Sequence, residues 1–133
     1  MTVITEPEAV ATEPQAPSIY EAIGGRPSVK AAVDGLYVRL FADPELSRYF
    51  PAGLSDRHRA YVVTLLGEAF GGPERYRGPD LAAAHRHLRI SNAHFDQTAA
   101  HLDAVLDGLG VPRELTDQII GIVASLRPHI VTA

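Results

Sequence analysis

The sequence predicts an all-α protein, and three observations carry this prediction. Apolar residues recur at intervals of three and four in several long stretches, the spacing that gathers them on one face of a helix. Serine or aspartate commonly precedes these stretches and glycine or proline follows them, as expected of helix caps and stops. No stretch alternates apolar and polar residues for long. With 133 residues the chain has room for one core, around which we expect four long helices and two or three short ones.

The first two helices are predicted near the N-terminus. Ser18 and Glu21 have the spacing of a capping box, in which each side chain accepts from the other residue's backbone N–H. The Gly24-Gly25 pair ends this short helix. Pro27 follows where the first turn of a second helix tolerates proline. The apolar face of that second helix comprises Val29, Ala32, Val33, Leu36, Tyr37 and Leu40.

Two more elements are predicted in the middle of the chain. Asp43-Pro44 has the pattern of a cap followed by proline and leads into a short helical piece around Tyr49. Ser55 caps a longer helix that ends sharply at Gly71-Gly72-Pro73. The inward face of that longer helix is predicted to comprise His58, Val62, Leu65, Leu66, Ala69 and Phe70.

Three helices are predicted in the C-terminal half. A short one runs from Asp80 to about Leu88. Ser91 caps a long helix that Gly110 closes, and Val111-Pro112 opens the last helix. The apolar face of the long helix comprises Phe95, Thr98, Ala99, Leu102, Val105, Leu106 and Leu109. The apolar face of the last helix comprises Leu115, Ile119, Ile120, Val123, Leu126 and Ile130.

Composition and charge exclude several classes of function. Residues 1–17 hold three glutamates, three prolines and no basic residue, so we predict a disordered tail before one domain at residues 18–133. The net charge is −4, and the domain itself is nearly neutral. The protein therefore lacks the positive surface of a nucleic-acid-binding protein. No apolar stretch has the length of a membrane span, and no secretory signal pattern is present. The absence of cysteine excludes disulfides and thiolate metal sites, and fits a cytoplasmic location.

Helical spacing separates the histidines by direction. His85 shares a face with Leu81 and Leu88, whereas His87 lies about 200° round the helix and points outward. A buried imidazole needs a partner for each nitrogen, so His85 is an odd choice for a plain core. His58 shares the apolar face of its own helix near the solvent end.

The same argument from helix faces applies to Tyr37, His94 and His101. The buried face of the second helix carries Tyr37, whose hydroxyl also needs a partner. His94 and His101 are interpreted as part of a polar face. The sequence has no zinc-protease, phosphate-loop or serine-hydrolase motif. What remains is a helical pocket with one imidazole from a short helix, and a tyrosine and a second imidazole from two other helices. This set suits a flat apolar cofactor that carries its own metal and is ligated from one side.

Seven stretches of the sequence occur together in one known family. They are residues 19–25 (IYEAIGG), 36–40 (LYVRL) with Asp43, 46–50 (LSRYF), 71–78 (GGPERYRG), 84–88 (AHRHL), 93–95 (AHF) and 110–112 (GVP). With these stretches in this order, the chain from residue 18 to residue 133 resembles the truncated haemoglobins, specifically their group I. The resemblance implies a globin with two helices packed over two around haem b, the glycine pairs being the breaks between helices.

The resemblance also assigns roles to residues. It makes His85 the proximal ligand of the haem iron, Phe50 the ring that wedges against the haem face, and Tyr37 the distal hydroxyl that donates to dioxygen. Further residues are expected to line the haem: Val62, Leu66, Tyr76, Leu81, Leu88, Ile90, Phe95, Thr98, Ile119 and Val123.

At two distal positions the sequence departs from the family pattern, which often has glutamine where His58 and Val62 stand. Val62 cannot donate a hydrogen bond. For His58 two roles remain open: a second donor beside Tyr37, or a side chain that swings to occupy the sixth iron position. Both roles make His58, with Tyr37, a candidate functional residue.

The function that the resemblance implies is dioxygen binding with conversion of nitric oxide to nitrate. An external reductase is then needed to return the iron, and carbon monoxide is expected as a further small ligand. The alternative is reversible oxygen storage, delivery or sensing without turnover. A helical interaction domain without cofactor is a third interpretation, which would leave a buried His85 poorly satisfied.

Overall fold

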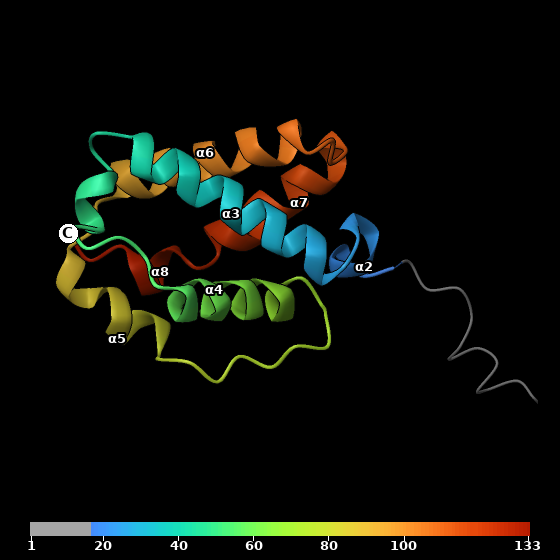
Figure 1. Cartoon of the computed structure of the whole chain (residues 1–133), viewed down its shortest axis with the longest axis horizontal. Helices are drawn as coiled ribbons and strands as arrows, with labels where there is room; N and C mark the ends of the chain where they lie inside the picture. Colours follow the sequence, from blue (N-terminus) through green and yellow to red (C-terminus); the bar gives the residue numbers. More distant parts are fainter. Residues whose placement is uncertain (1–16) are drawn as a thin grey trace, which may run out of the picture.

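The computed structural model describes residues 17–133 and confirms the all-α prediction (Figure 1). The expected tail at residues 1–16 lies outside this part of the chain. The helices in chain order are α2 (Ile19–Ile23), α3 (Arg26–Ala42), the 3₁₀ turn η2 (Ser47–Tyr49), α4 (Asp56–Ala69), α5 (Leu81–His85), the 3₁₀ turn η3 (Arg86–Leu88), α6 (Asn92–Gly108), α7 (Arg113–Ala124) and α8 (Arg127–Ile130). Among these residues no helix is long and apolar enough to cross a membrane.

The predicted caps form. The Ser18 hydroxyl accepts from the backbone N–H of Glu21 at 3.1 Å, and the Glu21 carboxylate accepts from the Ser18 N–H at 3.3 Å. The side chains of Ser55, Asp80 and Ser91 likewise accept from the first turns of α4, α5 and α6. Each cap satisfies a backbone donor that the helix itself leaves unpaired. The sequence therefore marked the start of four helices correctly.

Helix α3 lies at the centre of the fold and packs against α2, α4 and α6. Its Val29 and Val33 are fully buried. Gly35 faces α6 so closely that a β-carbon there would meet a Val105 methyl at 2.9 Å. Helix α6 in turn packs against α7. The pairs α3 with α4 and α6 with α7 thus form the two-over-two arrangement.

The inward face of α4 differs from the predicted one. His58 and Ala69 are exposed, although the spacing placed them on the apolar face. The loop after α4 folds back so that the Glu74 carboxylate covers Gly67, which adds this residue to the buried face. The loop is held by the Tyr20 hydroxyl, which donates to Glu74 at 2.8 Å. The buried residues of α4 and its C-cap are Val63, Leu66, Gly67 and Phe70.

The last predicted helix is two helices in the structure. Helix α7 ends at Ala124, and α8 begins at Arg127. Pro128 explains the break, because it has no N–H to donate to the Ala124 carbonyl and its ring crowds that carbonyl. Leu109, predicted to be buried, is 51% exposed and lies at the C-cap of α6.

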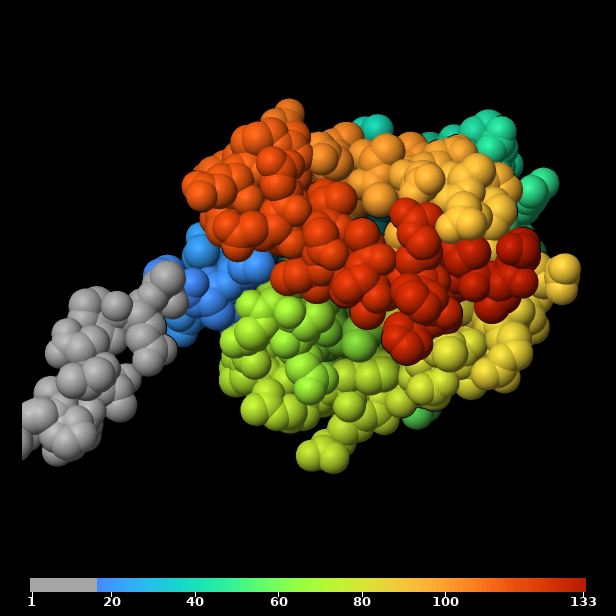
Figure 2. All heavy atoms as spheres, turned by 180° about the vertical axis from the view of Figure 1, so that it is seen from behind, coloured from blue at the N-terminus to red at the C-terminus, as the bar shows by residue number. Residues whose placement is uncertain are grey.

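The C-terminal segment braces α5 and η3. The backbone N–H groups of Thr132 and Ala133 donate to the Ile90 carbonyl at 3.0 and 3.2 Å, and Ile90 forms a parallel bridge with Val131. The Thr132 hydroxyl donates to the Arg86 carbonyl at 3.1 Å. Figure 2 shows this segment, in red, between α6 and the yellow α5 region. The short helix that carries His85 is therefore held from outside as well as by its own cap.

Candidate functional site

His85 ends helix α5 with one ring nitrogen already engaged. Its Nδ1 lies 2.8 Å from the Leu81 carbonyl oxygen. Because a carbonyl only accepts, Nδ1 carries the hydrogen and Nε2 of the neutral ring keeps its lone pair. A ligating histidine is typically oriented by such a bond to its other nitrogen. His85 is half-buried whereas His87 is exposed, as the helical spacing predicted.

Tyr37 is buried on α3, with 8% of its surface exposed. Its ring meets Phe50 edge to face at 5.6 Å between centroids, and Phe41 at 5.9 Å. Within residues 17–133 its hydroxyl makes no hydrogen bond. Burial raises the pKa of Tyr37 above its ordinary value, which the positive charge of Arg59 partly opposes. At neutral pH the group is therefore a protonated donor.

The predicted lining residues fall into two groups. One group belongs to the main hydrophobic cluster, and its members come from α3, α4, α7 and the residue after η2. Its members are Tyr37, Phe50, Val62, Leu66, Ile119 and Val123. The other group lies along α5, η3 and the start of α6, outside that cluster. Its members are Leu81, His85, Leu88, Ile90, Phe95 and Thr98.

The two groups fit a haem. We call these groups the first and second apolar walls: the second has one available imidazole nitrogen, and the first has one unpaired hydroxyl. In the described part of the chain no set of three acidic or histidine side chains could hold a bare metal ion. A haem suits these residues, because its porphyrin already coordinates the iron and the protein has to supply only one nitrogen ligand.

Two predicted site residues, His58 and Tyr76, belong to neither wall. His58 is exposed because it lies in the first turn of α4, where its backbone N–H donates to the Ser55 hydroxyl at 3.0 Å. Tyr76 lies in the loop after α4. Its hydroxyl donates to the Pro79 carbonyl at 2.6 Å, and its ring meets Tyr61 at 6.1 Å. The structure therefore corrects the prediction that His58 is buried on the apolar face of α4, whereas its role toward a cofactor stays a prediction.

The structure adds two residues that sequence analysis missed. Phe41 lies one turn after Tyr37 and contacts the rings of both Tyr37 and Phe50. Arg59, the neighbour of His58, places its guanidinium carbon 5.4 Å from the centre of the Tyr37 ring. The spacing of four between Tyr37 and Phe41 could have indicated the first contact. The sequence carries no signal for the second, which joins two helices.

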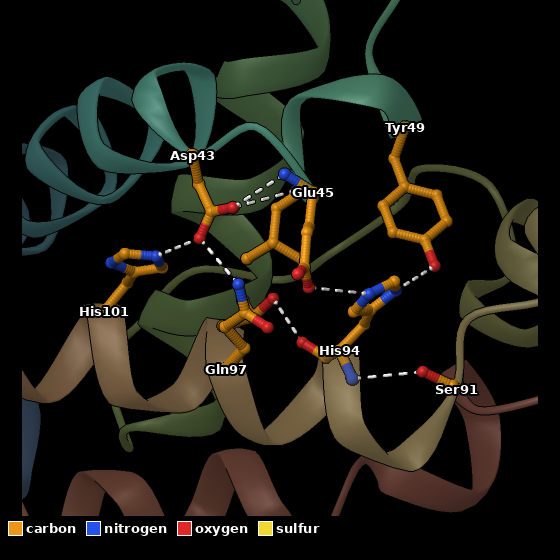
Figure 3. A network of polar contacts seen from close by, with 9 residues as sticks. Asp43, Glu45, Tyr49, Ser91, His94, Gln97 and His101 are labelled. Carbon is orange, nitrogen blue, oxygen red and sulfur yellow. Dashed lines mark hydrogen bonds and ion pairs between the residues drawn. The ribbon is translucent and has the colours of Figure 1, made fainter.

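His94 and His101 take part in a polar network instead of forming a solvated face (Figure 3). Arg39 donates from Nε to His101 Nδ1 at 3.0 Å, so His101 donates from Nε2 to the Asp43 carboxylate at 2.8 Å. Gln97 donates to the same carboxylate oxygen at 2.8 Å. The interpretation of His101 as simply part of a polar face is corrected by these contacts, since its side chain is only 19% exposed.

The second half of the network reaches the segment beside Phe50. The Tyr49 hydroxyl lies 2.7 Å from His94 Nδ1, and His94 Nε2 lies 3.3 Å from Glu45 (Figure 3). A neutral imidazole that accepts from Tyr49 and donates to Glu45 satisfies both contacts. The network therefore ties residues 43–49 to α6 and supports the neighbouring Phe50.

Comparison with known proteins gives a consistent family. Residues 18–132 match the family model described as "Bacterial-like globin". The chain is 36% identical to "Group 1 truncated hemoglobin GlbN" of Mycolicibacterium paratuberculosis, over 86% of this chain and 85% of that protein. It is 34% identical to "Group 1 truncated hemoglobin" of Tetrahymena thermophila, over 85% and 90% respectively.

Solved structures agree with the sequence relatives. The truncated hemoglobin of Tetrahymena pyriformis in its Fe(III) form superposes with a TM-score of 0.82 at 29% identity, covering 86% of this chain and 98% of that one. THB1 of Chlamydomonas reinhardtii superposes with a TM-score of 0.73 at 40% identity, covering 88% and 98%. The chain thus spans nearly the full length of both structures.

The Asp43 contacts predict a pH-dependent contribution to stability. Hydrogen bonds from His101, Gln97 and the backbone hold the pKa of Asp43 well below its ordinary value. A carboxylate whose pKa is lowered by folding stabilises the fold above its unfolded pKa, and this is lost as pH falls through the folded pKa. We expect Asp43→Asn to lower the urea midpoint at about pH 7, with the difference from wild type shrinking below about pH 4.

The matched control is Glu45→Gln, because Glu45 belongs to the same network but its side chain is 62% exposed. An exposed pair contributes little, so this variant should stay close to wild type. Equal losses in the two variants, or an Asp43→Asn deficit that persists undiminished at low pH, would contradict the assignment.

Proposed function

Since the chain belongs to the bacterial-like globins, and among them to the group 1 truncated haemoglobins, we propose that it holds one haem b through His85 and converts nitric oxide and dioxygen to nitrate. Dioxygen binding follows from the family, whereas the ligating residue and the reaction are the proposal. As proposed, turnover draws electrons from an external reductase.

The observation that carries the proposal is the orientation of His85. Its Nδ1–H is held by the Leu81 carbonyl, which leaves Nε2 as the donor for an axial bond. The Asp80 cap and the C-terminal brace on Ile90 keep this short helix in place. The imidazole is therefore preorganised, and little side-chain freedom is lost when the cofactor binds.

When bound, the haem supplies a ferrous iron that binds diatomic ligands and polarises dioxygen more strongly than carbon monoxide. Tyr37 then acts as a fixed donor to negative charge on the distal side. Phe50 and Phe41 confine its ring, and Val62 adds an apolar surface that excludes water without competing for the hydroxyl. This division of roles favours dioxygen over carbon monoxide.

His58 retains the two roles that the sequence left open. Its side chain is exposed in the first turn of α4, so packing in the core does not hold it in place. It can turn inward to donate beside Tyr37, or it can turn further to compete for the iron. The first role would slow dioxygen release, and the second would slow the binding of ligands to the iron.

Haem retention should depend on His85 and not on His87. We expect His85→Ala to lose stoichiometric haem after desalting, since the axial bond and the wall it anchors are lost together. His87→Ala should keep the Soret absorbance, because that side chain is exposed. Haem lost from the His87 variant and kept by the His85 variant would reverse the assignment.

Dioxygen release should depend on Tyr37. A hydrogen bond to a charged acceptor contributes about 1.5–3 kcal/mol, so Tyr37→Phe should speed dioxygen dissociation by about 10- to 150-fold. Carbon monoxide dissociation should change much less. Laser photolysis and ligand-replacement kinetics measure both rates. A change in dioxygen release below about twofold would contradict a distal hydrogen bond from Tyr37.

The same kinetics separate the roles of His58 in a His58→Leu variant. Faster dioxygen release would identify a second donor. Faster ligand binding, with loss of a six-coordinate spectrum in the ferric or deoxy form, would identify a competing ligand.

The proposed reaction is tested by mixing the oxygenated protein with nitric oxide in a stopped-flow instrument. We expect rapid conversion to the ferric spectrum with one nitrate formed per haem, because a bound haem would supply the reacting iron and Tyr37 would donate a hydrogen bond on its distal side. Slow dioxygen release without nitrate would instead support a storage or sensing globin. The control mixes the ferrous protein, free of dioxygen, with nitric oxide under anaerobic conditions and should yield no nitrate.

A further inference from the structure

We propose that Arg59 is a positioning residue for Tyr37: fixed by Asp34, its guanidinium lies over the phenol ring, holds the ring in place and strengthens the hydroxyl as a hydrogen-bond donor. This inference rests on the distal role proposed for Tyr37. It adds to that role a charged residue from the neighbouring helix.

The geometry links three side chains across the contact between α3 and α4. Arg59 projects from the second turn of α4, and its guanidinium carbon lies 5.4 Å from the Tyr37 ring centre. One guanidinium nitrogen lies 3.3 Å from an Asp34 carboxylate oxygen. Asp34 and Tyr37 are three residues apart on α3, so they share a face of that helix. Arg59 therefore meets both residues from one side.

Asp34 is itself held in position. Lys30, one turn earlier on α3, donates to its other carboxylate oxygen at 2.8 Å. The two cations hold the pKa of Asp34 below its ordinary value, so the carboxylate stays charged. The Arg59 side chain is only 25% exposed, although it is a long charged group near a helix end. It is thus partly desolvated and anchored at its charged end.

A cation over the face of a phenol acts on its hydroxyl. The positive charge stabilises electron density on the ring, which favours the phenolate and makes the neutral hydroxyl a stronger donor. The other rings against Tyr37, from Phe41 on α3 and Phe50 after η2, carry no charge. Within the described residues Arg59 is the charged group whose field acts on this phenol, against the effect of burial.

The same contact restricts where the hydroxyl can point. Phe50 meets the Tyr37 ring edge to face, with 88° between planes, and Phe41 meets it at 39°. Arg59 adds a contact from α4. The ring is therefore confined by residues from α3, from α4 and from the segment that connects these two helices. Because the hydroxyl lies at the end of the ring, small displacements of the ring would misdirect it.

A matched control lies two residues earlier on the same helix. Arg57 stacks on Tyr61 at 5.7 Å and donates from Nε to the Tyr61 hydroxyl at 3.1 Å. Both residues of that pair belong to α4, and neither contacts Tyr37. Arg57→Gln removes the same charge from the same helix and leaves the Tyr37 environment intact, so it reports any general effect of lost charge.

The first measurement follows the acidity of Tyr37 itself. The protein is labelled with 3,5-difluorotyrosine, whose phenol ionises nearer neutral pH, and ¹⁹F spectra of the carbon monoxide form are recorded against pH. The Tyr37 signal is the one missing from Tyr37→Phe. We expect Arg59→Gln to raise its pKa by about half a unit, and Arg57→Gln to leave it unchanged. Arg59→Lys, which keeps the charge, should restore most of the shift.

The second measurement compares ligand release. Arg59→Gln should speed dioxygen dissociation by about two- to fivefold, and carbon monoxide dissociation should change less. Asp34→Asn keeps the cation but frees its anchor, and should change the rates in the same direction by a smaller factor. A structural role alone could lower the melting temperature but would not raise the Tyr37 pKa or change the ratio of the two rates.

The outcomes separate this inference from the proposed function. If Tyr37→Phe speeds dioxygen release but Arg59→Gln changes neither the Tyr37 pKa nor the rate ratio, the role of Arg59 is overturned and the distal role of Tyr37 stands. If Tyr37→Phe leaves dioxygen release unchanged, the proposed distal role fails, and the positioning role of Arg59 fails with it. A raised pKa with faster dioxygen release in Arg59→Gln, absent in Arg57→Gln, supports the inference.

Discussion

The packing of α3 against two helices at once is the constraint on which the rest of the molecule depends. Val29 and Val33 are fully buried in this helix, and Gly35 permits close contact with α6 while other residues meet α4. A helix enclosed in this way has a fixed rotation about its axis, because any turn would bring its exposed residues, such as Lys30, into the core. That fixed rotation aims the Tyr37 ring at Phe50 and buries most of the residue, while its hydroxyl oxygen stays accessible.

The two apolar walls differ in how they are held, and the difference suits their roles. The wall with Tyr37 belongs to the continuous hydrophobic cluster and gains its rigidity from packing. In the wall with His85, the part that precedes α6 is a five-residue helix followed by a 3₁₀ turn, which is too short to be stable alone. It depends on polar contacts: the Asp80 cap, the Leu81 carbonyl and the backbone pairing of Ile90 with the C-terminal segment. In the proposed function, a bond from His85 to the haem iron would add to the contacts that already hold the imidazole.

Sequence reasoning succeeded where local rules decide the outcome. Caps such as Ser18 and Ser91, and the opposite directions of His85 and His87, follow from helix geometry over a few residues. It failed where a distant segment decides which face is covered. Gly67 is buried because Glu74 folds back over it, and no periodicity within α4 contains that information. His101 was taken as polar surface because its partners Arg39 and Asp43 lie about 60 positions away in sequence.

The family pattern and the structure single out different, adjacent residues of α4: the pattern indicates His58, and the structure indicates Arg59. The family pattern points to His58, since glutamine often stands at that position, yet its side chain is exposed at the start of α4. The next residue, one helical step round, meets the Tyr37 ring and the Asp34 carboxylate. An amide at the position of His58 would act on the distal ligand directly, whereas a guanidinium over the phenol acts through Tyr37. Under the roles proposed for Tyr37 and Arg59, a chain without a distal glutamine tunes the same hydroxyl by changing its acidity and its direction, in place of adding a second donor.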